Sequence, residues 1–298
     1  MTRPCKVGVQ LPEVERFVPW PEYLDLARRA EAVGLDSVWL GDHLLYDLPD
    51  GSTRGPYEAW TTLAAIAAVT ERVEIGPLVA STSFHAPAML AKQAATVDAI
   101  SGGRLIVGLG AGWNRREYDA FGFAYDRRVS RFEEALAVIV PLLREGRTTF
   151  HGQFYDVDDC VLDPRPARPG GPPVMLGSTS PRMLGIGLPV VDAWNVWWSI
   201  YDNSVDRFAQ VKAEVDAATP AGRAVEATAA VLVTLPGGRG RLMGDHYDTR
   251  VTTVTPDDLA GHVRGLAAAG ATHLQLVLDP ITVESIEVVG EVLADLDR

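Results

Sequence analysis

Short apolar segments alternate with longer segments of mixed polarity along the whole chain of 298 residues. The apolar segments have the length of single strands, and the segments between them carry apolar residues at the spacing of an amphipathic helix. Eight strands are predicted, at residues 7–10, 37–40, 73–80, 105–109, 174–176, 193–196, 227–235 and 273–278.

A helix is predicted after each strand, and Pro or Gly marks several of the boundaries. Pro21 suits a first helical turn, whereas Gly34 and Gly102 suit helix ends. The eight helices are predicted at residues 21–33, 56–69, 87–100, 129–145, 181–187, 203–218, 256–269 and 283–296.

Strands that alternate with helices predict a parallel sheet covered by helices. With eight such units, a closed (β/α)8 TIM barrel forming one domain over residues 1–298 is the natural architecture. A doubly wound open sheet is the alternative that periodicity does not separate from it. Two insertions interrupt the rhythm: a hairpin at residues 148–163, and a loop at residues 237–255 that we expect to be mobile.

The formal net charge of −12, with only three lysines, argues against binding to nucleic acid or to an anionic membrane surface. No run of about 18 apolar residues predicts a membrane span, and no signal peptide is apparent, so we expect a cytoplasmic protein. Cys5 and Cys160 lie far apart, and the histidines are scattered, so no disulfide, zinc site or other metal site is predicted.

In a parallel barrel the active site lies at the carboxyl ends of the strands, so the residues after each strand are the candidates. Asp42 and His43 directly follow the second predicted strand. Histidine is the side chain best suited to proton transfer near neutral pH. A purely structural role for this pair in the loop is an equal alternative.

Hydroxyl groups and glycines follow the third and fourth predicted strands. Ser81 could bond the edge of a flat heterocycle, and Gly110 would let a planar ligand approach the backbone. Trp113 and Asn114 could wall a pocket beside it. The glycine spacing here does not match a dinucleotide fingerprint, so a nicotinamide cofactor is not predicted.

A turn after the fifth predicted strand resembles a phosphate cradle. Gly177, Ser178 and Thr179 precede a helix whose free N–H groups would favour an anion, and Arg182 could add a bidentate contact. A simple helix cap at Ser180 is the alternative. Because metal ligands, a nucleophile elbow and a Walker loop are all missing from the sequence, an organic cofactor is implied.

Several segments in the same order resemble the luciferase-like monooxygenase superfamily, in particular its coenzyme F420-dependent branch. They include SVWLGDH, AMLAKQAATVDAISGGRLIVGLGAG, WNRREY, RFEEAL and DAWN, and they extend over residues 6–198. The resemblance implies a (β/α)8 barrel with an insertion, and hydride or oxygen chemistry on FMN or F420 at the barrel mouth.

The resemblance also implies roles for individual residues. Asp42 and His43 match an acid–histidine pair beside the deazaflavin, and His43 would act as a base or proton shuttle. Leu78-Val79 falls where F420-binding members have a non-prolyl cis peptide against the ring. Ser81 matches a hydroxyl that contacts the ring, and the turn at residues 177–179 matches the phosphate-binding turn.

This chain departs from the family pattern in two ways. Family members often place a lysine on the acidic part of the cofactor; here no lysine follows Lys212, so Arg182 would have to substitute. Trp113 stands where some F420 dehydrogenases carry an acidic residue, and nearby Glu117 has no assigned role. FMN therefore stays the alternative cofactor.

The resulting hypothesis is hydride transfer between F420 and a small-molecule substrate. His43 would move the accompanying proton, Asp42 would set its tautomer, and the loops at residues 42–55 and 237–255 would cover the site. The alternatives are an FMN-dependent monooxygenase supplied by a separate reductase, and a non-catalytic flavin-binding barrel. The apolar helices at residues 56–69 and 87–100 could form a homodimer interface, although burial against the barrel also explains them.

Overall fold

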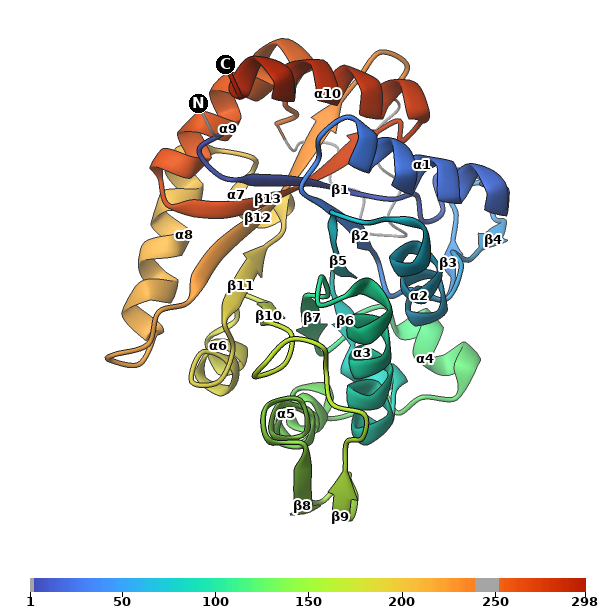
Figure 1. Ribbon diagram of the computed structural model, residues 1–298, viewed down its shortest axis with the longest axis vertical. Helices are drawn as coiled ribbons and strands as arrows, with labels where there is room; N and C mark the ends of the chain where they lie inside the picture. The colour runs from blue at the N-terminus through green and yellow to red at the C-terminus, as the bar shows by residue number, and fades with distance from the viewer. Residues whose placement is uncertain (1–2, 239–251) are drawn as a thin grey trace.

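Nine parallel strands form one ring in the computed structural model, which describes residues 3–238 and 252–298 (Figure 1). Their order is β5-β2-β1-β13-β12-β11-β10-β7-β6. The strands are β1 (Lys6–Gln10), β2 (Ser37–Leu40), β5 (Glu74–Pro77), β6 (Ala80–Ser81), β7 (Val107–Gly110), β10 (Val174–Gly177), β11 (Ala193–Val196), β12 (Glu226–Thr234) and β13 (Ala271–Asp279).

The ring is closed by pairing between the first and the last strand. Lys6 lies opposite His273, and Val9 lies opposite Leu276. On the other side β5 pairs with β2, and its continuation β6 pairs with β7, so these two short strands share one barrel position. The barrel is therefore confirmed over the open sheet, and the strand predicted at residues 73–80 is divided in two.

The eight predicted helices are confirmed, with shifts at some ends. Helix α2 begins only at Ala59, because the Glu58 side chain accepts the N–H groups of Trp60 and Thr61 as a cap. Helix α8 begins at Val205, after two residues with positive φ. The helices are α1 (Trp20–Ala32), α2 (Ala59–Val69), α3 (Pro87–Ser101), α5 (Arg128–Glu145), α6 (Pro181–Gly187), α8 (Val205–Ala218), α9 (Pro256–Ala268) and α10 (Val283–Leu296).

Several short elements lie in the segments that connect strands to helices. The predicted hairpin is confirmed as β8 (Arg147–His151) and β9 (Asp156–Val161), which project beyond α5 (Figure 1). In the predicted covering loop at residues 237–255, residues 239–251 lie outside the described part of the chain. Elements that the pattern did not predict are β3 (Tyr46–Asp47), β4 (Thr53–Arg54), η1 (Thr82–Phe84), α4 (Arg115–Phe121) and α7 (Trp198–Tyr201).

The main core lies between the barrel and the surrounding helices, and it also fills the barrel. Val7 and Val9 of β1 and Leu26 of α1 are fully buried, and Leu293 of α10 is almost fully buried. Within residues 3–238 and 252–298, no helix combines the length and the apolar character that crossing a bilayer requires.

Arg104 ties the end of α3 to the end of α2 through every N–H of its guanidinium group. Its Nε donates to the carbonyl of Ser101 at 2.7 Å. Its Nη1 donates to Thr70 Oγ1 at 3.0 Å and to the Val73 carbonyl at 2.6 Å. Its Nη2 donates to the carbonyls of Ala67 and Thr70 at 2.9 and 2.8 Å. The planar guanidinium group thus donates to carbonyls at the helix ends, which have no N–H partner within their own helix.

Replacing Arg104 by Met should lower the free energy of unfolding by about 2–4 kcal/mol, because buried carbonyls lose charge-assisted donors. Arg104→Lys should recover little of this loss, since an ammonium group lacks the fork geometry. Urea denaturation would measure both changes. Arg207→Met, which removes an exposed guanidinium bonded to Gln210, is the control. An equal effect of the Arg104 and Arg207 variants would contradict the assignment.

Candidate active site

Residues from different βα loops meet at the carboxyl end of the barrel. His43 follows β2, and Glu117 lies in α4 after β7, yet the two side chains are hydrogen-bonded. Asp42 also follows β2, and it accepts the backbone N–H of Ser81 at the end of β6. Three strands therefore contribute to one site at the end where a parallel barrel carries its chemistry.

One ring nitrogen of His43 is hydrogen-bonded to the protein, and the other is available to a ligand. Its Nδ1 lies 3.1 Å from each carboxylate oxygen of Glu117. Its ring clusters with those of Tyr46 and Trp113, at centroid distances of 4.8 and 5.6 Å. Among the described residues, no group hydrogen-bonds Nε2. Nδ1–H therefore donates to Glu117, and Nε2 is the nitrogen that can exchange a proton with a ligand.

Glu117 organises the segment that carries His43. Its carboxylate is almost fully buried and also accepts the backbone N–H groups of Leu44 and Leu45. Sequence reasoning left this residue unassigned. The available signal was an Asn-x-x-Glu spacing, because Asn114 caps α4 and places Glu117 in its first turn.

Asp42 has a different role from the one expected. Its Oδ2 lies 2.9 Å from His85 Nε2 and accepts the Ser81 N–H at 2.9 Å. The expectation that Asp42 sets the tautomer of His43 is therefore wrong, because Glu117 does so. Asp42 and His43 are adjacent in sequence but bond different partners, His85 and Glu117 respectively. His85, for which no role was predicted, belongs to this second acid–imidazole pair.

Glu13 is a further buried carboxylate at this end of the barrel, in the loop after β1. Gln10 Nε2 donates to its Oε1, and the Tyr46 hydroxyl lies 3.4 Å from its Oε2. A Cβ atom at Gly41 would overlap the Glu13 carboxylate, so a side chain at position 41 would displace that carboxylate from its present place. The sequence pattern gave no signal for Glu13, whose loop lacks a recognisable motif.

The Leu78–Val79 peptide bond is cis, as the family resemblance implied. The Val79 side chain occupies the space that Cβ atoms at Gly108, Gly110 and Gly177 would need. The space beside Gly110 is therefore occupied at least in part by Val79, and the contact of Gly110 with a cofactor stays a prediction. Val79 is half-buried, and its contact with a cofactor stays a prediction.

Two other predicted cofactor contacts are engaged within the protein. Ser81 Oγ lies 3.2 Å from the Tyr118 hydroxyl, which donates to the Ala111 carbonyl at 2.9 Å. Asn114 Nδ2 donates to the Leu45 carbonyl at 3.1 Å. Asn114 therefore fixes the loop that carries His43, and its contact with a cofactor stays a prediction, as does that of Ser81.

The predicted phosphate turn lies after β10, at the same end of the barrel. Ser178 and Thr179 are half-buried, and Ser178 Oγ accepts the Ser180 N–H at 3.2 Å. Arg182 donates from Nη2 to Ser130 of α5 at 2.7 Å. The guanidinium is thus directed toward α5 in this structure, and the phosphate contact of Arg182 stays a prediction.

The surroundings of His43 favour its protonated form. Burial of the imidazole opposes protonation, but the hydrogen bond to Glu117 and the charges of Glu13, Glu117 and Asp42 outweigh it. The pKa of His43 is consequently raised above its ordinary value. His43 can therefore act as a proton donor near neutral pH and as a base once it has lost its proton.

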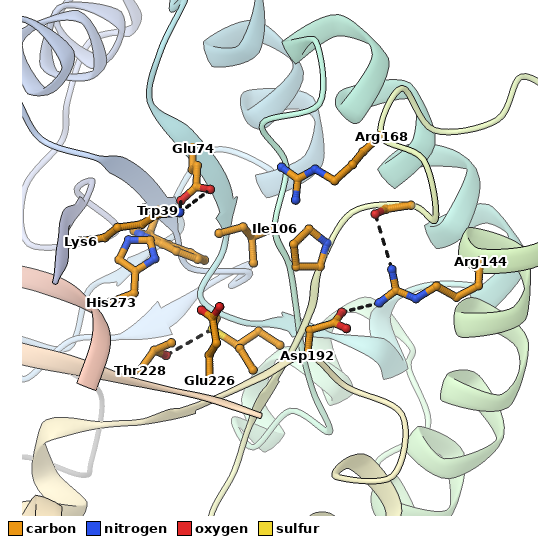
Figure 2. A pocket seen from close by; sticks show the side chains of 14 residues that line it. Lys6, Trp39, Glu74, Ile106, Arg144, Arg168, Asp192, Glu226, Thr228 and His273 are labelled. Carbon is orange, nitrogen blue, oxygen red and sulfur yellow. Dashed lines mark hydrogen bonds and ion pairs between the residues drawn. The ribbon is translucent and has the colours of Figure 1, made fainter. Parts of the chain in front are cut away.

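A cavity of about 360 Å³ lies at the opposite end of the barrel, where the strands begin (Figure 2). Lys6 and Glu74 form an ion pair at 2.8 Å beside it, and Arg144 pairs with Asp192. His273 lines its inner wall, and burial, with a smaller contribution from Lys6, lowers the pKa of this histidine to about 3. None of the predicted site residues lines this cavity. The Lys6–Glu74 pair joins the starts of β1 and β5, and the Arg144–Asp192 pair joins α5 to the segment before β11.

A parallel barrel with ionisable side chains at the carboxyl ends of its strands is the architecture of barrel enzymes. Residues 7–235 match the family model of the luciferase-like monooxygenases, and the chain belongs to this family. The recognition made from the sequence motifs is thereby confirmed.

Similar curated proteins include enzymes of two kinds. The F420-dependent glucose-6-phosphate dehydrogenase of Amycolatopsis mediterranei is 34% identical over 180 residues, which are 57% of this chain and 53% of that protein. Pyrimidine monooxygenase RutA of Escherichia coli is 38% identical over 117 residues, 38% of this chain and 32% of that protein. The chain thus spans about half the length, or less, of these relatives.

Solved structures share the fold over the whole chain. An F420-dependent secondary alcohol dehydrogenase, in complex with an F420–acetone adduct, has a TM-score of 0.77 at 20% identity and full coverage of both chains. EDTA monooxygenase of Chelativorans has a TM-score of 0.74 at 17% identity and covers 98% of this chain and 94% of its own. At these identities the likeness establishes the fold.

Replacing Glu117 by Gln should lower the pKa of His43, because the charge that offsets burial is removed. The proton affinity of the ring should fall by roughly tenfold or more. A pH titration of the His43 ring signals by NMR would measure the change. Asp119→Asn, which removes an exposed carboxylate paired with Arg115 in the same helix, should leave the titration unchanged. An unaltered pKa in the Glu117 variant would refute the assigned pairing.

Proposed function

We propose that the protein is an oxidoreductase that uses coenzyme F420 to transfer a hydride to or from a small organic substrate. The observation that carries this proposal is the state of His43, whose Nδ1 is fixed by Glu117 while Nε2 has no hydrogen-bond partner among the described residues. An imidazole held in this way can exchange a proton with a substrate hydroxyl or carbonyl.

The surface beside His43 fits a planar cofactor. Val79 follows a cis peptide bond and stands half-buried over glycines, and Ser81 lies next to it at the mouth. Ser178 and Thr179 offer hydroxyl and N–H groups at the start of α6, where a phosphate would be favoured. These residues would hold the cofactor, which supplies the hydride-accepting or hydride-donating carbon.

The contacts around His43 assign a different role to each neighbouring residue. Glu117 orients the imidazole, Asp42 holds the backbone of Ser81 in place, and Tyr46 and Trp113 limit the access of water to the His43 ring. In the reducing direction protonated His43 gives a proton to the substrate oxygen. In the oxidising direction its neutral form removes that proton.

An FMN-dependent monooxygenase is the second candidate, and the similarity to pyrimidine monooxygenase RutA favours it. Such an enzyme would need reduced flavin from a separate reductase. The F420 proposal stands first because the similarity to the F420-dependent dehydrogenase covers more of the chain, 57% against 38%. Oxygen uptake that depends on reduced FMN would support the second candidate.

Titration with F420 and with FMN, followed by tryptophan fluorescence, tests the choice of cofactor. Trp113 is 38% exposed and lies against His43, so a ligand at this site should quench it. F420 should bind more tightly than FMN, and Trp113→Phe should lose much of the quenching while still binding F420. Tighter binding of FMN would reject the first candidate, and binding of neither would reject both.

Replacing His43 by Ala should leave F420 affinity within a few-fold of wild type and reduce F420-dependent turnover by about 10²–10⁴-fold. The reason is that proton transfer is lost while the cofactor surface around Val79 and the turn at residues 177–179 remains. His151→Ala, in the exposed β8–β9 hairpin, should behave as wild type. Turnover that is unchanged in the His43 variant would overturn the proposed role.

A further inference from the structure

The imidazoles of the site already have buried anionic partners. His43 is paired with Glu117, and His85 is paired with Asp42; the side chains of Glu117 and Asp42 are 1% and 2% exposed. A carboxylate or phosphate arriving at His43 would therefore meet a positive charge that is already matched. It would also lose its hydration in exchange for a hydrogen bond from Nε2–H of an imidazole whose charge Glu117 already matches.

A third carboxylate acts on the same imidazole. The charge of Glu13 contributes to the raised pKa of His43, which shows that its field reaches the ring. Glu13 and Tyr46 are hydrogen-bonded, and Tyr46 packs on the His43 ring at 4.8 Å. An anion beside Nε2 would be repelled by Glu13, Glu117 and Asp42 across a site that screens charge weakly.

The cationic side chains on the loops that flank His43 have partners within the protein. The segments 11–19, 42–56 and 111–118 contain no lysine and four arginines. Each arginine bonds or pairs with a protein acceptor: Arg16 with Glu22, Arg54 with the Val14 carbonyl, Arg115 with Asp119 and Arg116 with Asp47.

The aromatic rings beside His43 also disfavour an anionic ligand. Tyr46 is buried, Trp113 is 38% exposed, and both pack against the imidazole. Aromatic surfaces favour apolar or aromatic groups and give an anion no compensating contact. The substrate atoms next to the reacting carbon therefore meet rings and buried carboxylates.

From these contacts we infer that the substrate is an uncharged alcohol or carbonyl compound, with no carboxylate or phosphate on the carbon next to the one that reacts. The inference rests on the proposed function for the role of His43, and it goes beyond it by naming the substrate class. It separates this site from one built for 2-hydroxy acids, which carry a carboxylate at that position.

A pair of isosteric probes tests the inference without requiring the natural substrate. Benzamide and benzoate have the same shape, but only benzoate is charged. Each is titrated into the F420-loaded protein at low ionic strength, and the ring signals of His43 and Trp113 are followed by NMR. Benzamide should perturb the signals of both residues, and its affinity should exceed that of benzoate by about tenfold or more. Equal or tighter binding of benzoate, or no response of His43 to benzamide, would overturn the inference.

Charge-neutralising variants separate electrostatics from shape. Glu13→Gln should strengthen benzoate binding several-fold and leave benzamide binding nearly unchanged, because only the anion responds to the lost charge. Asp206→Asn, an exposed site in α8, is the matched control for net charge and should change neither. An identical benzoate affinity in the Glu13 variant and wild type would count against the electrostatic argument.

The same titrations are repeated on the cofactor-free protein, so that a failure of the proposed function can be distinguished from a failure of the proposed substrate class. Absence of F420 binding would refute the proposed function, while the preference between benzamide and benzoate in the free protein still decides the charge of the ligand. Binding of F420 together with a preference for benzoate would refute only the substrate class.

Discussion

Pairing between β1 and β13 closes the sheet into a barrel, and the common rim on which the site lies depends on this closure. Once the first strand lies against the last, all parallel strands end at one rim, and loops that are distant in sequence become neighbours. Asp42 and His43 after β2 then lie beside His85 and Glu117, which follow β6 and β7. The core of Val, Leu and Ala residues around the barrel holds this rim in a fixed geometry.

Within that rim, backbone N–H groups and buried carboxylates hold one another. Glu117 accepts two N–H groups of the loop that carries His43, and Asp42 accepts the N–H of Ser81. Each carboxylate also has an imidazole partner. Buried charges are stable only when they are paired and hydrogen-bonded, so loop geometry and imidazole orientation are set by the same groups.

The strands and helices could be predicted because hydrophobic periodicity is local. Helix α6 and helix α10 begin and end at the predicted residues, and β2 does as well. The partner of His43 could not be predicted in the same way, since Glu117 lies 74 positions away. Adjacency in sequence suggested Asp42 instead, whereas in the structure Asp42 bonds His85. The cis peptide at Leu78–Val79 was anticipated only through family resemblance, because no local pattern specifies it.

The two acid–imidazole pairs have different consequences because they join different elements. The Asp42–His85 pair lies between the end of β2 and the segment after η1, and through Ser81 it fixes the strand end that carries Val79. The His43–Glu117 pair joins the β2 loop to α4 and leaves one ring nitrogen without a bond to the described residues. Under the proposed function, the first pair would shape the surface that a cofactor contacts, and the second would present the group that exchanges a proton. A change in Asp42 would then act mainly on cofactor affinity, and a change in Glu117 mainly on proton transfer.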